Sequence, residues 1–340
     1  MHQPLAEDNT AILSAIDQLV RQWRPLTFIP KQDQQLSDSD TLNAYLSYYG
    51  LDQLPAAQHG FGFLNVSGDR ICTQYWMPEK PYGKLFLVHG YYDHVGLYRH
   101  AIEFGLRHNM AVVAFDLPGH GLSDGERATV DDFEHYTAAL ADVFEQAKKL
   151  PVAGPNVGLA QSTGCAVLLK YQLDRASWFQ AEATFTAQIF LAPLVRPKGW
   201  KFGRFAHWLV SPFMASLRRV FSQNSHDEQF LELIQRDPLQ PRILSLRWVG
   251  AMKRWIAQAE QASCLDVPTL MIQGNEDHTV DWRYNVPLLC TKLPRHHIYW
   301  LNTGMHQLIN ESPELRAEYM AVADSFVDSF LRTRKPHEAA

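Results

Sequence analysis

The stretch "GLAQSTGCAV" (residues 158–167) contains a serine that could act as a nucleophile. The pentapeptide Ala160-Gln161-Ser162-Thr163-Gly164 departs from the nucleophile-elbow pattern G-x-S-x-G only at its first position. A buried-strand pattern precedes Ser162 and a helix-like stretch follows it, which is the strand–turn–helix context that the motif requires. The residues two before and two after must be small, as Ala160 and Gly164 are. The alternative is that Ser162 only caps the following helix.

A serine hydroxyl is a poor nucleophile unless a base removes its proton. The segment "WLNTGMHQLINE" supplies His306, in a glycine-containing loop between the last apolar run and the last helix. His296 and His297 are alternatives, but they lie at the start of that run. The start of a parallel strand is at the end of the sheet opposite the loops that carry catalysis. We therefore expect His306 to be the base.

The base in turn needs a carboxylate that fixes its tautomer and stabilises the imidazolium. The segment "MIQGNEDHTVD" follows the preceding apolar run and offers Glu276, Asp277 and Asp281. Asp277 is placed where a short loop could turn its carboxylate toward His306. In some enzymes with such a serine motif the acid follows an earlier strand, the one before the insertion. Here that strand ends "IFLAPLVRP" with no acid. We therefore expect Asp277 to be the acid, with Asp116 as an alternative.

An oxyanion that forms next to such a serine needs two backbone donors. We expect one to be the N–H of Thr163, at the start of the helix after the serine. We expect the other to be the N–H of Tyr91, because Gly90 lets the loop after "KLFLVHG" turn closely. His89 is better explained as a hydrogen-bonded core residue than as a catalytic one. The loop "DLPGHGLSDG" (116–125) is better explained as structural support for the active-site face.

Short apolar runs alternate with helical stretches from residue 84 onward, which is typical of strands buried on both faces of a mainly parallel sheet. The runs cover 84–90, 110–116, 156–162, 187–193, 269–274 and 297–302. Before them, "FGFLNVSG" and "RICTQYWMP" predict an antiparallel hairpin with Ser67-Gly68-Asp69 at the turn. The predicted fold is α/β: a mainly parallel central sheet, an antiparallel N-terminal hairpin and helices on both faces.

Helical spacing of apolar residues predicts a mainly helical extension over residues 1–55, including a short helix from about Thr41 to Tyr49. Residues 56–194 and 264–335 are expected to form the core. Within the core, Thr129 is expected to cap the helix that follows it, and Ser312-Pro313-Glu314 to open the last helix.

About 70 residues separate "FLAP" from "VPTLMIQG", far more than a usual connection. We interpret residues 195–263 as a helical cap inserted over the carboxyl ends of the strands, in which Pro212 would interrupt any single long helix. The segment Arg196–Phe221 is rich in cations and aromatic residues and holds no acid. Such a surface suits contact with anionic lipid headgroups. The alternative is that its apolar side packs on the core and lines a pocket while the charges are solvated.

The composition excludes several classes of protein. The net charge of −5 gives no indication of a nucleic-acid partner. The four cysteines form no C-x-x-C pair and the fifteen histidines form no metal-ligand spacing, so we expect reduced thiols and no metal. The start "MHQPLAEDNT" is not a secretory signal, and no apolar stretch of about 18 residues predicts a transmembrane helix. We expect a cytoplasmic protein, either free or peripheral to the inner face of the membrane.

Taken together, "HGYYDH", "DLPGHGLSDGER", "QSTG", "QGNEDHTVD" and "GMHQLINE" resemble the α/β-hydrolase superfamily. The closer resemblance is to its monoacylglycerol lipase and lysophospholipase-like branch, sometimes grouped with serine aminopeptidases, and it covers roughly residues 58–335. It implies the triad Ser162, Asp277 and His306 in the chain order named for that fold, with Tyr91 and Thr163 as oxyanion donors. It also implies no cofactor and a cap that shapes the acyl pocket. The chain departs from the branch at Ala160, in its Tyr-Tyr-Asp-His sequence and in its N-terminal helical segment.

The activity expected from these residues is hydrolysis of carboxylic esters through an acyl-enzyme, with monoacylglycerols or lysophospholipids as substrates. One alternative is an aminopeptidase or other amidase on the same fold. Acidic residues in the cap would then hold the free amine of the substrate, and the segment 196–221 has none. The other alternative is a non-catalytic binding protein, because a fold does not by itself determine a function.

Overall fold

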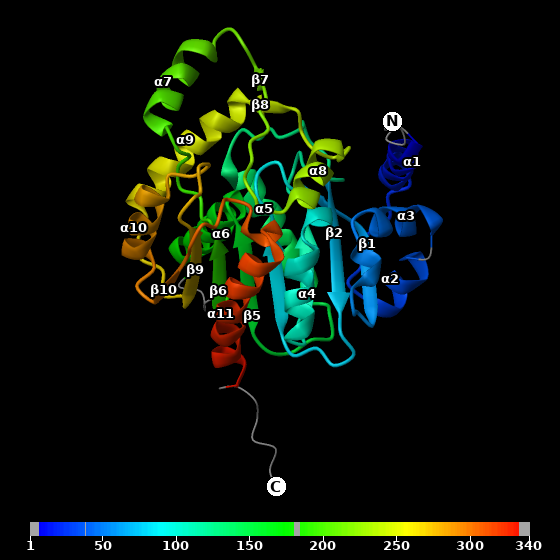
Figure 1. Cartoon of the computed structure of the whole chain (residues 1–340). Coiled ribbons are helices and arrows are strands. Elements are labelled where there is room, and N and C mark those ends of the chain that lie inside the picture. The colour runs from blue at the N-terminus through cyan, green and yellow to red at the C-terminus, as the bar shows by residue number, and fades with distance from the viewer. Residues whose placement is uncertain (1–6, 38, 180–183, 333–340) are drawn as a thin grey trace.

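The computed structural model describes residues 7–37, 39–179 and 184–332, with an eight-stranded sheet at its centre and helices on both faces (Figure 1). The strands are β1 (Gln58–Val66), β2 (Asp69–Met77), β3 (Lys84–Val88), β4 (Ala111–Phe115), β5 (Asn156–Gln161), β6 (Ala187–Leu191), β9 (Thr269–Gly274) and β10 (His296–Leu301). Their order is β1-β2-β4-β3-β5-β6-β9-β10. β1 and β2 form the expected antiparallel hairpin, β2 is antiparallel to β4, and the other neighbours are parallel. The predicted fold class is confirmed.

Every residue of β3 is buried, and successive side chains enter different cores. Leu85 and Leu87 belong to the core that α4 and α11 cover, whereas Phe86 and Val88 belong to the core that α5 and α6 cover. Burial on both faces explains why the strands are continuous apolar runs in the sequence. The helices that flank the sheet are α4 (Arg99–Arg107), α5 (Phe133–Ala147), α6 (Thr163–Phe179), α10 (Trp282–Lys292) and α11 (Pro313–Arg332). Single 3₁₀ turns are η1 (Leu51–Gln53), η2 (Val95–Leu97) and η3 (Leu308–Asn310).

The prediction that Thr129 caps α5 is wrong. Asp132 is the cap, because its backbone is extended and its carboxylate accepts the N–H of Glu134 at 3.2 Å. The hydroxyl of Thr129 instead donates to the carbonyl of Arg127 at 3.0 Å. The last helix begins at Pro313, as expected.

Within the described residues, three α-helices precede β1: α1 (Glu7–Arg21), α2 (Pro30–Ser37) and α3 (Asp40–Tyr48). The chain between α1 and α2 lies along β1, where Leu26 N–H donates to Phe63 O at 3.1 Å and Phe63 N–H donates to Arg24 O at 2.8 Å. These bonds cover the edge of the sheet, which would otherwise present unpaired backbone groups. The sequence did not predict α2, whose residues PKQDQQLS lack apolar periodicity. The buried Asp33 anchors it by accepting the N–H and the hydroxyl of Thr27.

The insertion (residues 195–263) separates β6 from β9 and lies together at one end of the molecule (Figure 1). It contains α7 (Trp200–Val210), β7 (Ser216–Arg218), α8 (Glu228–Arg236), β8 (Ile243–Ser245) and α9 (Leu246–Gln261). α7 ends two residues before Pro212, as that proline predicts. The rest is less helical than expected, because β7 and β8 form a separate antiparallel pair. Within the described chain, no helix is both long and apolar enough to cross a bilayer.

The apolar residues of α7 and the following loop point mostly to the surface. Trp200 is buried, but Phe202, Phe205, Trp208 and Phe213 are 77%, 58%, 68% and 84% exposed. These four side chains therefore do not pack on the core, and the alternative that they do is wrong. Of the segment 196–221, Pro197 and Arg219–Phe221 line the cavity that contains Ser162, whereas Phe213 lines a separate pocket.

Candidate active site

Ser162 lies in the turn between β5 and α6, in a backbone conformation that is unfavourable for a non-glycine residue. Its φ is 54°, in the left-handed region. Its N–H donates to Leu191 O at 2.9 Å and its carbonyl accepts the N–H of Cys165 at 3.0 Å, so both neighbours hold the turn in place. Gly164 is required because a Cβ there would lie 2.1 Å from Val88 O. A sharp strand-to-helix turn of this kind projects the serine hydroxyl beyond the sheet.

Ala160 occupies the position where the elbow motif has glycine. Its methyl group is fully buried in the core that α5 and α6 cover. The bonds that hold the Ser162 turn are present beside it. The extra methyl group is therefore compatible with the turn.

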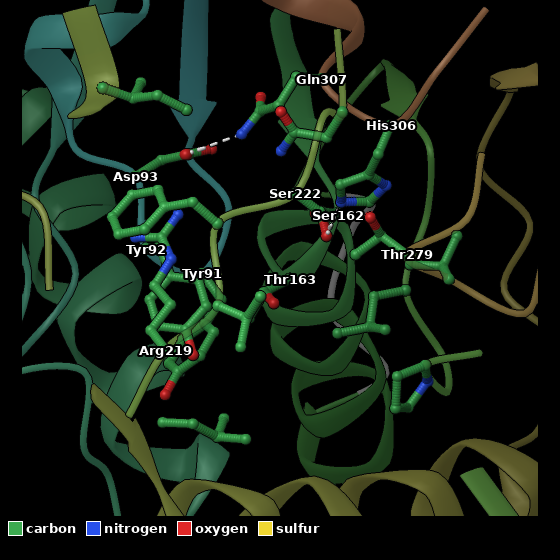
Figure 2. A pocket seen from close by; sticks show the side chains of 18 of the residues that line it. Tyr91, Tyr92, Asp93, Ser162, Thr163, Arg219, Ser222, Thr279, His306 and Gln307 are labelled. Carbon is green, nitrogen blue, oxygen red and sulfur yellow. Dashed lines mark hydrogen bonds between the residues drawn. The ribbon is translucent and has the colours of Figure 1, made fainter. Parts of the chain in front are cut away.

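His306 lies in the loop between β10 and η3 and joins Ser162 to Asp277. Its Nε2 is 2.9 Å from Ser162 Oγ and its Nδ1 is 2.8 Å from Asp277 Oδ2. All three residues are buried, and Ser162 and His306 lie side by side on the wall of a cavity (Figure 2). A carboxylate only accepts hydrogen bonds, so Nδ1 carries the ring proton and Nε2 is left to accept the serine O–H. This arrangement can remove the proton of a serine nucleophile.

The loop after β9 fixes the carboxylate of Asp277. Its Oδ1 accepts the N–H groups of Thr279 and Val280 at 2.7 and 3.1 Å, and its Oδ2 accepts Gln273 Nε2 at 3.2 Å. Burial by itself raises the pKa of Asp277, but His306 and the two N–H groups outweigh burial and lower the pKa below its usual value. Asp277 is therefore ionised at neutral pH and can orient the imidazole.

The pKa of His306 is shifted in the opposite direction to that of Asp277, upward. Burial lowers the pKa of His306, but the charge and hydrogen bond of Asp277, with a further contribution from the charge of Asp93, raise it overall above its usual value. Stabilisation of the imidazolium is what a base needs at the moment when it has taken the serine proton.

The other candidate acids lie elsewhere. Glu276 is exposed. Asp281 forms an ion pair with Arg196, at 2.8 Å. Asp116 accepts two backbone N–H groups, from the loops that follow β3 and β4, at 2.7 and 2.8 Å. Asp116 thereby holds those two loops together, which is the structural role expected for the 116–125 segment.

The other candidate histidines also have different surroundings. His296 and His297 lie at the start of β10, and His296 Nδ1 bonds to a carbonyl of the preceding loop at 2.7 Å. His89 is buried, with Nδ1 donating to Gly90 O at 2.8 Å and Nε2 accepting the N–H of Leu117 at 2.9 Å. His89 is therefore the satisfied core residue that the sequence suggests.

The two expected oxyanion donors both line the cavity with Ser162. Within the described part of the chain, the backbone N–H groups of Tyr91 and Thr163 donate no hydrogen bond, so both are free to bind a substrate oxygen. Gly90 lies between Ser162 and the loop: a Cβ there would be 3.4 Å from Ser162 Cβ and 2.9 Å from Asp93 Oδ2. The ring of Tyr91 stacks on Trp248 of the insertion, with 3.7 Å between centroids.

Four buried polar residues next to the triad were not singled out from the sequence. Gln161 donates to Gln307 Oε1. Gln307 Nε2 in turn donates to Asp93 Oδ1 at 2.9 Å (Figure 2). Tyr98 donates to Asp93 Oδ2 at 2.8 Å. Burial raises the pKa of Asp93 despite these bonds. The one sequence feature that could have indicated them is position, since Gln161 directly precedes Ser162 and Gln307 directly follows His306.

The cavity beside Ser162 has a volume of about 290 Å³, at the lower end of the usual range for ligand pockets. Its polar lining residues include Asp93, Arg219, Asn224 and Gln307. Its apolar lining residues are Leu194, Pro197, Val220, Phe221, Ile234, Leu244, Trp248, Met252 and Val280. Among the described residues, no group of three or more His, Cys, Asp or Glu side chains could hold a metal ion.

The amino-acid sequence is similar to those of known hydrolases. The family model for serine aminopeptidase S33 matches residues 79–313. The monoglyceride lipase of Mus musculus is 26% identical over 283 residues, covering 78% of this chain and 88% of the relative. The monoacylglycerol lipase of Mycolicibacterium smegmatis is 24% identical, covering 64% of this chain and 79% of the relative.

Solved structures share the fold. A soluble variant of monoglyceride lipase from Saccharomyces cerevisiae, in complex with a substrate analogue, has a TM-score of 0.67 at 14% identity and covers 79% of this chain and 94% of that structure. A thermostable carboxyl esterase from Bacillus coagulans has a TM-score of 0.65 at 16% identity, covering 80% and 99%.

Proposed function

The chain belongs to the serine aminopeptidase S33 family of α/β-hydrolases, and on this premise we propose that it cleaves carboxylic esters through an acyl-enzyme. The observation that carries the proposal is the unbroken hydrogen-bonded chain from Ser162 through His306 to Asp277, on the wall of a largely apolar cavity. In this proposal Ser162 is the nucleophile, His306 the base and Asp277 the acid.

In the first half of the reaction, Ser162 Oγ attacks the ester carbonyl carbon while His306 Nε2 takes the hydroxyl proton. The carbonyl oxygen becomes an oxyanion, which the N–H groups of Tyr91 and Thr163 stabilise. The carbon–oxygen bond to the alcohol then breaks, and the alcohol leaves with the proton from His306. The acyl group remains on Ser162.

In the second half, a water molecule takes the place of the alcohol. His306 removes a proton from the water as its oxygen attacks the acyl carbon, and the same two N–H groups hold the second oxyanion. The bond to Ser162 Oγ breaks and His306 returns the proton to the serine. The products are a carboxylic acid and the regenerated enzyme.

We propose a lipid-like ester as the substrate, with monoacylglycerols and lysophospholipids as the first candidates. The relatives named above include monoglyceride lipases, and the apolar lining residues of the cavity suit an acyl chain. An aminopeptidase is the alternative. Against it, Asp93 is the one carboxylate among the described residues that line the cavity, and its oxygens already accept Tyr98 and Gln307.

We further propose that α7 and the loop after it dock on an anionic lipid surface. Phe202, Phe205 and Trp208 are exposed on α7, and Lys201 and Arg204 of the same helix form no ion pair within the described chain. Exposed aromatic side chains beside unpaired cations are typical of a helix that lies in the membrane interface. Such docking would bring the cavity to its substrate.

The experiment that tests the proposed function is turnover by Ser162→Ala on a soluble ester such as 4-nitrophenyl hexanoate, alongside a monoacylglycerol, a lysophospholipid and a prolyl amide. We expect a loss of about five to six orders of magnitude if the triad acts as a unit. Ser325→Ala, which removes an exposed hydroxyl on α11, is the control and should retain full activity. Turnover retained in a clean Ser162→Ala preparation would contradict the proposal, and preference for the prolyl amide would favour the aminopeptidase.

A further inference from the structure

Arg219 extends from the end of β7 into the cavity that contains Ser162 (Figure 2). Its guanidinium lies between two aromatic rings, 3.9 Å from the centroid of Tyr92 and 4.3 Å from that of Phe221. Its backbone N–H donates to Arg242 O at 3.0 Å, which continues the β7–β8 pairing. The side chain is thus held on the cavity wall by stacking on Tyr92 and Phe221 and by the backbone pairing of β7 with β8.

The guanidinium retains hydrogen-bonding capacity. Of its five N–H donors, those on Nη1 bond to Gln240 Oε1 at 2.6 Å and Pro241 O at 3.2 Å. Nε and Nη2 have no hydrogen-bond partner among the described residues. No carboxylate in the described chain forms an ion pair with Arg219 either. Asp93 lines the same cavity and attracts the guanidinium electrostatically, but the two groups form no ion pair, and the oxygens of Asp93 accept Gln307 and Tyr98.

An arginine in such a place usually has an anionic partner. Charged groups that are removed from water are normally paired, because leaving the charge unpaired costs free energy. A planar guanidinium binds the oxygens of a phosphate or carboxylate through two parallel hydrogen bonds. Nε and Nη2 of Arg219, which have no hydrogen-bond partner among the described residues, can form these two bonds to a substrate in the cavity.

We propose that Arg219 binds an anionic group of the substrate, a phosphate or a carboxylate, so that the preferred substrates are anionic esters rather than neutral monoacylglycerols. This inference rests on the proposed function and narrows its substrate class. The anionic group can belong to the alcohol, as in an acylglycerol phosphate, or to the acyl part, as in a monoester of a dicarboxylic acid. The chemistry that Arg219 recognises is the same in both.

The charges around the insertion agree with an anionic substrate. The segment 196–221 contains six cations and no acid, and Lys201 and Arg204 have no ion-pair partner in the described chain. An excess of positive charge in a segment that contributes to the cavity wall raises the local concentration of anionic ligands and speeds their association.

The test compares kcat/KM for two pairs of soluble esters that differ only in an anionic group. One pair is monohexanoylglycerol and monohexanoylglycerol 3-phosphate, and the other is 4-nitrophenyl hexanoate and the mono-4-nitrophenyl ester of adipic acid. Arg219→Gln is compared with Arg242→Gln, whose guanidinium also lies over Phe221, at 5.0 Å, but is exposed and outside the cavity lining. Arg219→Lys tests whether charge alone suffices.

We expect Arg219→Gln to lower the anionic-to-neutral ratio of kcat/KM about 10- to 100-fold for one of the pairs. The pair that responds identifies which part of the substrate carries the charge. Arg219→Lys should lose less of the ratio, and Arg242→Gln should leave it within about twofold. Ratios that change no more in Arg219→Gln than in Arg242→Gln, for both pairs, would overturn the proposal.

A binding measurement keeps the inference testable if Arg219→Gln fails to fold or if the esters are not cleaved. Calorimetry on the wild-type chain should show at least about tenfold tighter binding of hexyl phosphate or hexanoate than of hexanol. Equal affinities would overturn the inference about Arg219. Absence of turnover of every ester, with this preference intact, would instead overturn the proposed function.

Discussion

The hydroxyl of Tyr49 donates a buried hydrogen bond of 2.7 Å to Oδ1 of Asp237, 188 residues further along the chain. Tyr49 directly follows α3, and Asp237 directly follows α8 of the insertion. The other oxygen of Asp237 is 2.8 Å from Nε2 of His94, in the loop that also provides Tyr91. One buried carboxylate therefore links the N-terminal helices, the insertion and the loop beside the serine.

Tyr49→Phe should lower the free energy of unfolding by about 1.5–3 kcal/mol, because it removes a hydrogen bond to a charged acceptor that is buried. Tyr319→Phe is the matched comparison, since its hydroxyl is equally buried but donates to a neutral carbonyl, Leu308 O, at 2.8 Å. That variant should cost about 0.5–1.5 kcal/mol. Urea denaturation of both variants provides the measurement. A smaller loss for Tyr49→Phe than for Tyr319→Phe would show that the link is weak.

Substitutions at the two small positions of the elbow should have opposite outcomes. Gly164→Ala should prevent correct folding or destabilise the protein strongly, because the new Cβ would lie 2.1 Å from Val88 O, and a backbone atom cannot move aside easily. Ala160→Gly restores the usual motif and should cost only about 0.5–1 kcal/mol, with turnover retained. Thermal unfolding and ester hydrolysis measure both effects. Normal stability of Gly164→Ala would contradict the described geometry.

The pH dependence of kcat/KM should reflect His306, which must be unprotonated to act as the base. A pKa raised above the usual value of about 6.5 keeps the ring protonated to higher pH, so the acid limb of the profile should lie above pH 6.5. Burial lowers the pKa of His306 and the carboxylate of Asp277 is the main group that raises it, so Asp277→Asn should move the acid limb to lower pH. In the same variant kcat should fall by about four orders of magnitude, as in serine proteases. Asp93→Asn should shift the limb in the same direction by less. A limb that stays in place in Asp277→Asn would contradict the assignment.

Docking of α7 on a lipid surface can be tested separately from catalysis. Replacement of both Phe205 and Trp208 by Ser should weaken binding to vesicles that contain phosphatidylglycerol at least about tenfold, since each buried aromatic side chain contributes about 1.5–3 kcal/mol. Hydrolysis of the soluble 4-nitrophenyl hexanoate should not change. Trp300→Ser, on β10 and 46% exposed, is the control. An equal loss of vesicle binding in the control variant, or no binding by the wild type, would exclude α7 as the docking site.

The sheet could be predicted from the sequence because most of its parallel strands, such as β3, are buried on both faces and so are continuous apolar runs, whereas the edge strand β10 is only partly buried. The Ser162 turn could be predicted because so sharp a turn needs small residues two positions before and after the serine. Ala160 and Gly164 meet this need, and they form a short pattern that can be recognised in the sequence. The grouping of Ser162, Asp277 and His306 could be anticipated because the carboxyl ends of parallel strands meet at one edge of a sheet.

The remaining features depend on contacts between distant residues. α2 is held by the hydrogen bonds of Asp33 to Thr27 rather than by apolar spacing. The N-cap of α5 depends on which side chain, that of Thr129 or that of Asp132, reaches a free N–H at the start of the helix. Arg219 is one cation among several in its segment, and only the folding of β7 against β8 places it on the cavity wall. No local pattern indicates these contacts.

The most direct test of the central claim is reaction with a fluorophosphonate, followed by intact mass and peptide mapping. We predict a single covalent adduct on Ser162 in the wild-type chain, no adduct in Ser162→Ala, and much slower labelling in His306→Ala. A wild-type chain that hydrolyses esters but is not labelled, or one labelled equally well after Ser162→Ala, would contradict the account.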